Sequence, residues 1–154
     1  MRLTRQSSYA IRTLIYCAVN APELSRIADI AKAHAISELF LFKLIRPLVD
    51  AGLIETVRGR KGGIRLGRPA AEITLLDTIK LTEENFALAE CFEGGDILCP
   101  LADACDLNGA LHEALTAFFD VLESYTIADL AGKRRTLRLR LGLGLEDLVP
   151  VAAH

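Results

Sequence analysis

The spacing of apolar residues in the first third of the chain predicts three helices in succession. Thr4 can cap a helix that runs to about Asn20, because an apolar stripe recurs at helical spacing along one side. Ser25 is the expected cap of a second, short helix, and Ser37 is the expected cap of a third, in which Pro47 predicts a kink or an early end. The second and third helices are separated by only a few residues, as in a helix-turn-helix motif whose second helix reads DNA.

A β-hairpin with a basic tip is expected after the third helix. Residues 53–57 and 64–66 have the composition of two strands, and they flank the glycine-rich turn R-G-R-K-G-G at 58–63. Glycine permits a tight turn, and arginine at a protruding tip suits the strongly negative minor groove of DNA. A solvated hairpin without a partner is the alternative. Directly after a helix-turn-helix, the hairpin indicates a wing, so the predicted fold class is mainly α, with a winged helix-turn-helix domain over residues 1–70.

The second half of the chain predicts a short helix, a loop and a long helix. Thr74 and Asp77 have the spacing of a capping box, so a linking helix and a cysteine loop are expected over residues 71–106. Residues 107–131 should form a long helix with the strongest apolar periodicity of the chain and a short capped turn after it. We expect a partner chain to cover this apolar face in a homodimer, and packing on its own domain is the alternative. Residues 132–154 are expected to form a loose tail, with an added strand as the alternative. The expected interface residues are Leu111, Leu115, Phe118 and Leu122.

Charge is distributed unevenly along the 154 residues, whose formal net charge is −2. Residues 1–70 carry 12 Lys and Arg against 5 Asp and Glu, a balance of +7, whereas residues 71–130 carry 1 against 13, a balance of −12. Residues 131–154 carry 5 against 2, a balance of +3. An electropositive first half can meet a phosphate backbone, and an acidic second half would be repelled by it. The charge pattern therefore favours nucleic-acid binding by the winged domain.

Three of the four cysteines, Cys91, Cys99 and Cys105, lie in one acidic, glycine-containing loop. Thiolates on one flexible segment can close around a single centre, and soft sulfur ligands select iron–sulfur clusters or zinc. The C-x7-C-x5-C spacing differs from that of zinc ribbons and bacterial ferredoxins, and three ligands leave one coordination position open, which suits a labile, sensing centre. A disulfide with a spare thiol, or three unrelated cysteines, are the alternatives.

The start of the chain has no signal-peptide pattern, and no stretch reaches the roughly 18 apolar residues of a membrane span. We therefore expect a cytoplasmic protein. A reducing cytoplasm argues against structural disulfides and favours metal or redox chemistry for the cysteines.

Nearly the whole chain resembles the Rrf2 superfamily of bacterial transcription regulators, and within it the RirA-type, iron-responsive regulators of rhizobia. The resemblance is carried by M-R-L-T-R-Q at the start, I-S-E-L-F-L-F-K at the reading helix, G-L-I-E-T-V-R-G-R-K-G-G-I-R-L through the wing, and A-E-C-F-E with C-P-L-A-D-A-C-D-L-N in the loop. It implies a repressor of iron-uptake genes that holds a 4Fe-4S iron–sulfur cluster when iron is plentiful and loses it when iron is scarce. A 2Fe-2S cluster would be a degraded form.

The resemblance also implies roles for single residues. The three loop cysteines correspond to the cluster ligands of the family, Ser37 to a serine that contacts DNA, and Arg58 to a wing arginine that enters the minor groove. Leu39 and Lys43 lie where side chains can reach base edges or neighbouring phosphates. The full set of expected contacts with double-stranded operator DNA is Arg2, Thr4, Ser37, Glu38, Leu39, Lys43, Arg58, Gly59, Arg60 and Lys61.

No fourth cluster ligand carries over from the family. Its nitric-oxide sensors use an aspartate where this chain has Ser8, and its cluster-biogenesis regulators use a histidine where this chain has Asn108. A redox-sensing relative uses a histidine near the position of Arg12, and arginine, which stays protonated, cannot serve. Cys17 lies on the apolar side of the first helix, where free cysteine is commonly a small buried hydrophobe, so we expect it in the core. Ser8, Asn108, a carboxylate such as Glu90 or a non-protein ligand are the candidates.

The favoured function is therefore a dimeric DNA-binding repressor controlled by an iron–sulfur cluster. A thiol or redox switch, or a nitric-oxide sensor that uses the same cysteines, is the alternative within this class. An electron-transfer or cluster-carrier protein is less well supported, because it needs neither a basic wing nor a reading helix. An enzyme is least supported, because no motif places a nucleophile–base pair, a nucleotide loop or a carboxylate pair. His34 and His112 are expected to be surface or packing residues.

Overall fold

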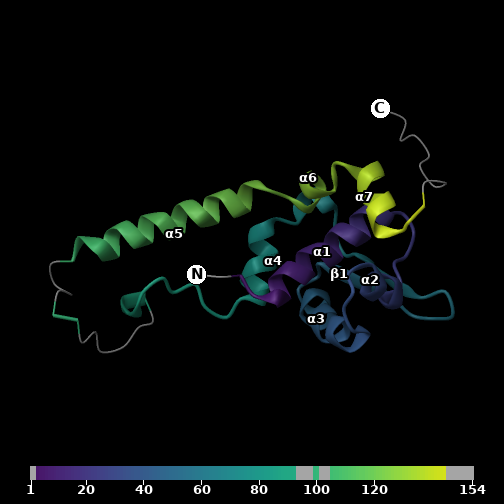
Figure 1. Cartoon of the computed structure of the whole chain (residues 1–154), viewed down its shortest axis with the longest axis horizontal. Helices are drawn as coiled ribbons and strands as arrows, with labels where there is room; N and C mark the ends of the chain where they lie inside the picture. The colour runs from purple at the N-terminus through teal and green to yellow at the C-terminus, as the bar shows by residue number, and fades with distance from the viewer. Residues whose placement is uncertain (1–2, 93–98, 101–104, 145–154) are drawn as a thin grey trace.

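Helix α1 (Arg5–Asn20) forms the centre of the helical body in the computed structural model, which describes residues 3–92, 99–100 and 105–144. The side chain of Thr4 accepts a hydrogen bond from the amide of Ser7, so the predicted cap is confirmed. Ala10 and Leu14 on the predicted apolar stripe are fully buried. Around α1 are packed α3 (Glu38–Asp50), α4 (Leu75–Thr82), α6 (Ile127–Ala131) and α7 (Arg134–Leu141) (Figure 1).

The helix-turn-helix consists of α2 (Ile27–Ala33) and α3. Ser37 caps α3 as predicted, because its Oγ accepts a hydrogen bond from the amide of Phe40 at 3.2 Å. The early end expected at Pro47 is wrong, since α3 continues to Asp50. Leu48, directly after the proline, is fully buried, and its packing opposes the loss of the backbone hydrogen bond that proline removes.

Strands β1 (Ile54–Val57) and β2 (Gly63–Leu66) form the predicted antiparallel hairpin. Ser25 is not the cap of α2, which corrects the sequence prediction. Its backbone exchanges two hydrogen bonds of 2.9 Å with Ile64, and the cap position falls on Arg26, whose side chain makes no capping bond. Ser25 therefore extends the sheet by one bridge and ties the hairpin to the body.

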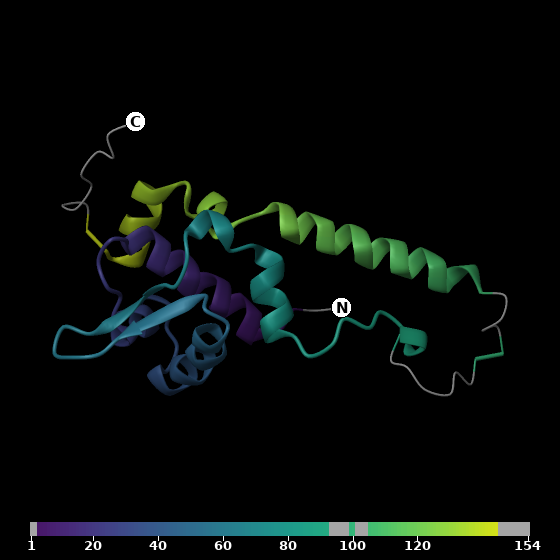
Figure 2. The ribbon, with the colours of Figure 1, turned by 180° about the vertical axis from the view of Figure 1, so that it is seen from behind.

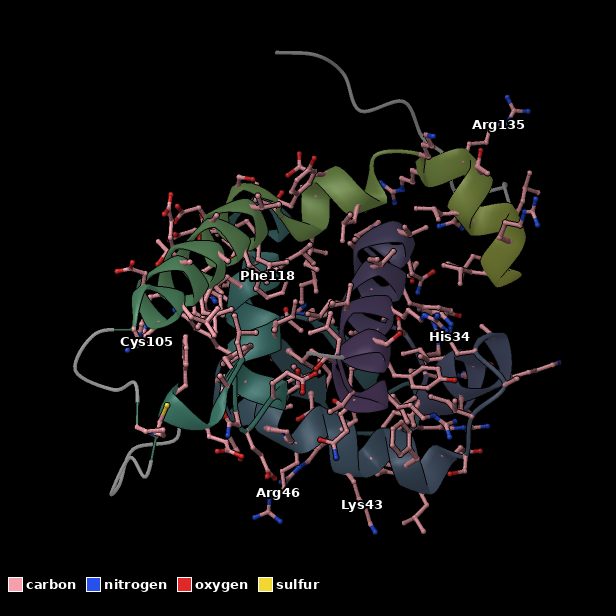
Figure 3. The ribbon with its side chains drawn as sticks, turned by 60° about the vertical axis from the view of Figure 1, so that its left-hand side comes forward. His34, Lys43, Arg46, Cys105, Phe118 and Arg135 are labelled. Carbon is pink, nitrogen blue, oxygen red and sulfur yellow. The ribbon has the colours of Figure 1, made fainter. Side chains whose placement is uncertain are left out.

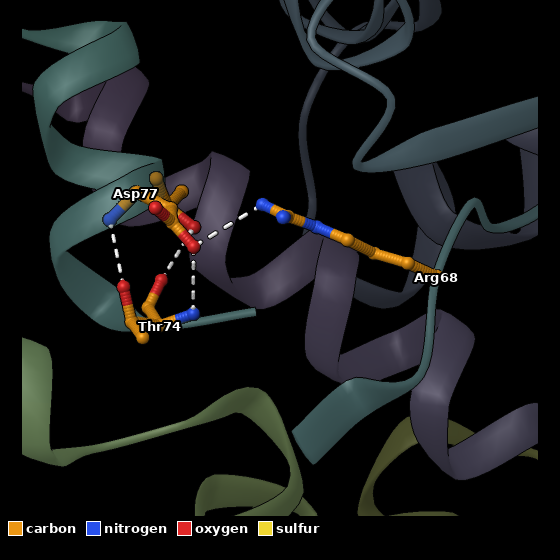
Figure 4. A network of polar contacts seen from close by, with 4 residues as sticks. Arg68, Thr74 and Asp77 are labelled. Atoms are coloured by element: carbon orange, nitrogen blue, oxygen red, sulfur yellow. Dashed lines mark hydrogen bonds and ion pairs between the residues drawn. The ribbon is translucent and has the colours of Figure 1, made fainter. Parts of the chain in front are cut away.

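Capping boxes begin α4, as predicted, and α6, where the sequence predicted a capped turn. Oγ1 of Thr74 accepts from the amide of Asp77 at 3.0 Å, and Oδ2 of Asp77 accepts from the amide of Thr74 at 3.1 Å (Figure 4). The same carboxylate oxygen accepts from Nη2 of Arg68 at 3.2 Å, which links the end of the hairpin to the start of α4. Thr126 and Asp129 repeat the arrangement at α6.

Helix α5 (Asp106–Ser124) projects from the body as a long arm, at the end opposite to the tip of the hairpin (Figure 2). Its C-terminal end returns to the start of α4. There the amide of Leu75 donates to the carbonyl oxygen of Tyr125, and the amide of Ile127 donates to that of Ile73, both at 2.9 Å. No residue of α5 is fully buried, so its apolar face is only partly covered by the described part of the chain.

Helix α7 takes the place of the loose tail or added strand expected after residue 132, and that expectation is wrong for residues 134–141. Nε of Arg134 donates to the carbonyl oxygen of Val19 at 3.1 Å, and Arg138, 1% exposed, donates to the same oxygen at 3.2 Å. Both cations therefore lie at the C-terminal end of α1, where the helix dipole favours positive charge. Residues 145–154, in the remainder of the predicted tail, lie outside the described residues.

Candidate DNA-binding surface and cysteine segment

Helix α3 has two faces of opposite character. Its inner face is a core stripe of Leu41, Leu44, Ile45 and Leu48, all at most 5% exposed. The opposite face presents a stripe of apolar and basic side chains to solvent, and Lys43 and Arg46 extend away from the body (Figure 3). The four exposed residues of this stripe are Leu39, Phe42, Lys43 and Arg46.

The start of α3 carries two further predicted DNA contacts. Ser37 is exposed and its Oγ is used as a cap acceptor, which leaves its hydroxyl proton available to an outside acceptor. Glu38 is exposed in the first turn, where the helix dipole favours a carboxylate. A reading helix that enters the major groove contacts bases with its N-terminal residues, so both positions suit that role.

The hairpin tip presents the predicted wing residues to solvent. Arg58, Gly59, Arg60 and Lys61 are all exposed. The turn requires glycine: Gly59 has a φ of 120°, and a Cβ at Gly62 would lie 2.4 Å from a backbone carbonyl oxygen. The tip therefore holds three cations that the described chain does not neutralise with an ion pair.

Not all the basic residues of the first half are available to an outside partner. Nε of Arg65 lies 2.9 Å from Oε2 of Glu55 on the paired strand, and this hydrogen bond and charge lower the pKa of Glu55. Arg68 is paired with Asp77. The structure thus separates the cations that hold the hairpin in place from those at its tip.

The N-terminus of α1 is tied to the end of α4. The amide of Thr4 donates to Oε1 of Glu83 at 2.6 Å, Oγ of Ser7 donates to the same oxygen, and Oγ of Ser7 lies 2.7 Å from Oγ1 of Thr82. Partial burial acts to raise the pKa of Glu83, but the hydrogen bonds from Ser7 and Thr4 outweigh it, so the pKa is lowered. The predicted DNA contact at Thr4 is therefore linked to Glu83, the first residue after α4, where the segment that carries Cys91, Cys99 and Cys105 begins (the cysteine segment). Arg2, another predicted DNA contact, lies outside the described residues.

The cysteine segment connects α4 to α5. The backbone of Cys91 lies in the short helix η2 (Glu90–Phe92), Cys99 is exposed, and Cys105 is the N-cap residue of α5 and makes no capping hydrogen bond through its side chain. Cys99 and Cys105 are free thiols. Residues 93–98 and 101–104 lie outside the described residues, and within the described ones no three metal-ligating side chains lie together.

Two ring contacts hold the first part of this segment along α5. The ring of Phe92 stacks on that of His112 with 4.2 Å between centroids, and Phe86 meets Phe119 edge-on at 5.0 Å. His112 and Phe119 are two turns apart on α5, so the chain from Phe86 to Phe92 runs along one face of that helix. His112 is thereby a packing residue, as predicted. The arrangement fixes both ends of the cysteine segment on α5, and its chemistry, three soft thiol donors on one tethered loop, fits an iron–sulfur cluster.

Cys17 lies in the core, as predicted. Its side chain is 2% exposed, and burial raises the pKa of its thiol to about 12, against a smaller lowering effect of a hydrogen bond with Ser25. A thiol held neutral in this way is unsuited to metal ligation, which requires the thiolate. Of the candidate fourth ligands, Glu90 is exposed beside Cys91, and Asn108 lies three residues after Cys105 in the first turn of α5.

His34 is a packing residue as well. Its ring meets that of Tyr16 edge-on, with 6.3 Å between centroids. Burial, and then the charge of Arg12, lower the pKa of His34, so that the neutral imidazole is favoured in the folded protein.

The predicted dimer residues are only partly covered by the described chain. Leu111, Leu115, Phe118 and Leu122 are half-buried, and the neighbouring Leu107 and Val121 are 61% and 56% exposed. Sequence reasoning did not select Phe42 and Arg46 on α3. The signal was present in the sequence, because both residues lie outside the helical spacing of the apolar stripe Leu41, Leu44, Ile45 and Leu48.

No helix among the described residues is long and apolar enough to cross a membrane. A sequence model of the Rrf2 family, described as an iron-dependent transcriptional regulator, matches residues 3–133. Protein aau3 of Rhizobium meliloti (strain 1021) is 61% identical over 143 residues, which cover 93% of each chain. The HTH-type transcriptional regulator NsrR of Geobacillus kaustophilus (strain HTA426) is 47% identical over 139 residues, 90% of this chain and 95% of that protein. The oxidized form of Staphylococcus aureus CymR superposes with a TM-score of 0.65 at 31% identity, over 85% of this chain and 96% of that one. The predicted winged helix-turn-helix fold is thereby confirmed.

Proposed function

Because the chain belongs to the Rrf2 family of transcriptional regulators, we propose that it is a homodimeric repressor whose operator binding depends on an iron–sulfur cluster. The cluster would report iron availability, as in the RirA-type regulators that the sequence resembles. The proposal rests on one observation: a chain with an exposed basic reading helix and wing also carries a three-thiol segment that is tied to the same domain. On this proposal, the protein is a transcription regulator rather than an enzyme.

The exposed surface of α3 and the wing supports operator binding. Lys43, Arg46 and the tip residues Arg58, Arg60 and Lys61 are exposed cations, which suits a phosphate backbone. The reading helix would enter a major groove, and the wing would reach the adjacent minor groove. Two copies joined through α5, whose apolar face is only partly covered within one chain, would present two reading helices to half-sites about one helical turn, roughly 34 Å, apart.

The thiols of Cys91, Cys99 and Cys105 support a cluster. Sulfur ligands select iron–sulfur centres, and such a centre, when bound, supplies a redox-sensitive and iron-dependent crosslink between its ligands. In this chain the crosslink would join η2 to the first turn of α5. One ligand position would be left to Glu90, Asn108, Ser8 or a non-protein donor. The iron dependence named for the matching family agrees with this assignment.

Coupling between the thiols and DNA would pass through two contacts of the described chain. Glu83 holds the amide of Thr4 at the start of α1, and it is also the residue with which the cysteine segment begins. Phe92 holds the same segment on α5 through His112. Ordering of the segment would therefore set both the winged domain and the dimer helix. A coupling free energy of about 1–3 kcal/mol would change operator affinity about 5- to 150-fold.

Anaerobic isolation followed by a visible spectrum and iron and sulfide counts tests the cofactor. Cys91→Ser, Cys99→Ser and Cys105→Ser should each lose the visible absorbance, because two protein thiolates are too few to retain the cluster. Cys17→Ser should keep it, since that thiol lies in the core. A folded Cys17→Ser variant without colour would contradict the ligand assignment.

Mobility-shift titrations of cluster-loaded and apo protein at fixed salt test the coupling. The loaded form should bind the operator more tightly, a direction that comes from the family resemblance. Equal or tighter binding by the apo form would refute the iron-replete repressor. Colourless protein whose DNA binding responds to oxidant and thiol reductant would instead support the thiol switch, for which the exposed Cys99 is suited.

A further inference from the structure

We propose that Leu39 and Phe42 form an apolar reading surface that recognises the methyl groups of thymine in the major groove. This rests on the proposed DNA-binding function and deepens it, because it assigns a chemical specificity to the reading helix. It makes two side chains of α3 the determinants of a preference for thymine.

The exposure of the two side chains is the first step. Leu39 is 67% exposed and Phe42 is 55% exposed, while the core stripe of the same helix is buried. They are three positions apart, so they are neighbours on one face of the helix. A single exposed apolar residue needs no explanation, but two adjacent ones next to the exposed cations Lys43 and Arg46 form a patch that suits a partner.

The charges around the patch identify the partner as DNA. Lys43 lies beside both residues on the exposed face and Arg46 follows one turn later, while the exposed Glu38 directly precedes Leu39. The three exposed cations of the wing tip belong to the same winged domain. A polyanion such as DNA complements these exposed cations. Within the major groove the C5 methyl of thymine is the apolar group, and apolar side chains contact it. A protein partner would use the apolar patch but would not require the neighbouring cations Lys43 and Arg46.

The spacing along α3 agrees with the spacing of bases. Residues three apart on a helix differ by about 4.5 Å along its axis, and stacked bases on one strand are about 3.4 Å apart. Leu39 and Phe42 can therefore contact methyl groups on adjacent base pairs or on base pairs one step further apart. The preferred half-site should contain thymines at that separation, on one strand or across both.

Replacement of thymine by deoxyuridine tests the inference, because it removes the methyl group and keeps every hydrogen-bonding group. The probe is a duplex selected from a random library by the full-length, anaerobically isolated protein, with single thymines replaced in turn. Wild-type affinity should fall about fourfold for each contacted methyl, the factor that corresponds to about 0.8 kcal/mol per buried methyl-sized group. A Leu39→Ala/Phe42→Ala variant should bind both duplexes equally.

Leu139→Ala is the matched control. Leu139 is 59% exposed on α7, away from the reading helix, so this variant should keep the wild-type ratio of affinities. Because all three residues are exposed, circular dichroism should show unchanged folding for both variants.

The outcomes separate the inference from the proposed function. Equal wild-type affinity for the thymine and uracil duplexes, or an unchanged ratio in the Leu39→Ala/Phe42→Ala variant, overturns the methyl-reading surface alone. Unchanged DNA binding with an altered sedimentation coefficient in that variant would make the patch a protein contact, and would also overturn it. Failure to select any duplex, with no salt-dependent binding, would overturn the proposed function first.

Discussion

Replacing Arg138 by methionine should destabilise the protein strongly, because its guanidinium group is buried against backbone carbonyl oxygens. The side chain is 1% exposed and donates to the carbonyl oxygens of Val19 at 3.2 Å, Leu143 at 2.7 Å and Gly144 at 2.9 Å. These contacts join the end of α1 to α7 and to the residues after it. Methionine keeps a similar length and apolar stem but donates no hydrogen bond.

The magnitude follows from two opposing contributions. A hydrogen bond to a charged group contributes about 1.5–3 kcal/mol, so three together contribute about 5–9 kcal/mol. Burial of the guanidinium charge costs several kcal/mol of desolvation free energy, and this cost disappears in the methionine variant. The expected loss of unfolding free energy is about 2–4 kcal/mol. With a urea m-value of about 2 kcal/mol per molar, the midpoint should fall by about 1–2 M.

Urea denaturation followed by far-UV circular dichroism, at one fixed protein concentration, measures this loss, because dimer stability depends on concentration. Arg135→Met is the matched control: Arg135 is exposed on the same helix, and its substitution should change stability by less than about 0.5 kcal/mol. Equal midpoints for the Arg138→Met and Arg135→Met variants would refute the role assigned to the buried guanidinium and the docking of α7 through it.

Three further predictions concern pH, assembly and DNA. The pKa of His34 is lowered in the folded protein, so the free energy of unfolding should decrease as the pH falls from the pKa of the unfolded chain, about 6.5, through the pKa of the folded protein. The His34→Gln variant should show a weaker pH dependence in urea midpoints measured at several pH values. An equal slope in both proteins would contradict this prediction. Phe118→Asp should shift the sedimentation coefficient toward the monomer, whereas Leu139→Asp should not; an unchanged dimer would place the interface elsewhere. Arg58→Ala should reduce the salt dependence of operator binding by about one unit, and Arg65→Ala, whose charge is already paired with Glu55, should change it less; equal effects would argue against the exposed tip as the phosphate contact.

Elements whose signals are local were predictable from the sequence. The caps at Thr4 and Ser37, the capping box at Thr74 and the capped turn at Thr126 depend on hydrogen bonds between residues three apart, so residue type and spacing suffice to find them. The core position of Cys17 followed from the apolar stripe in the same way.

Elements that depend on distant partners were mispredicted. Ser25 has the composition of a cap, but it pairs with Ile64, which is far along the chain. Pro47 should disfavour a helix locally, but the buried Leu48 holds the helix in place. The alternating Leu and Arg residues after residue 132 have no hydrophobic periodicity that distinguishes a helix from a strand. Their helix is positioned by bonds from Arg138 to Val19, and no pattern within a short window contains that information.

The sequence by itself determined the chemistry available to this protein: three thiols on one segment, a basic first half and an apolar stripe on the long helix. Only the tertiary structure decided which of these groups are free to act. It neutralises Arg65 and Arg68 within the hairpin region and leaves Arg58 and Lys43 exposed, and it buries Cys17 while Cys99 faces solvent. The reason is physical. Residue type sets what a side chain can bind, whereas burial and pairing, which depend on residues far away in the sequence, set the free energy at which it can do so.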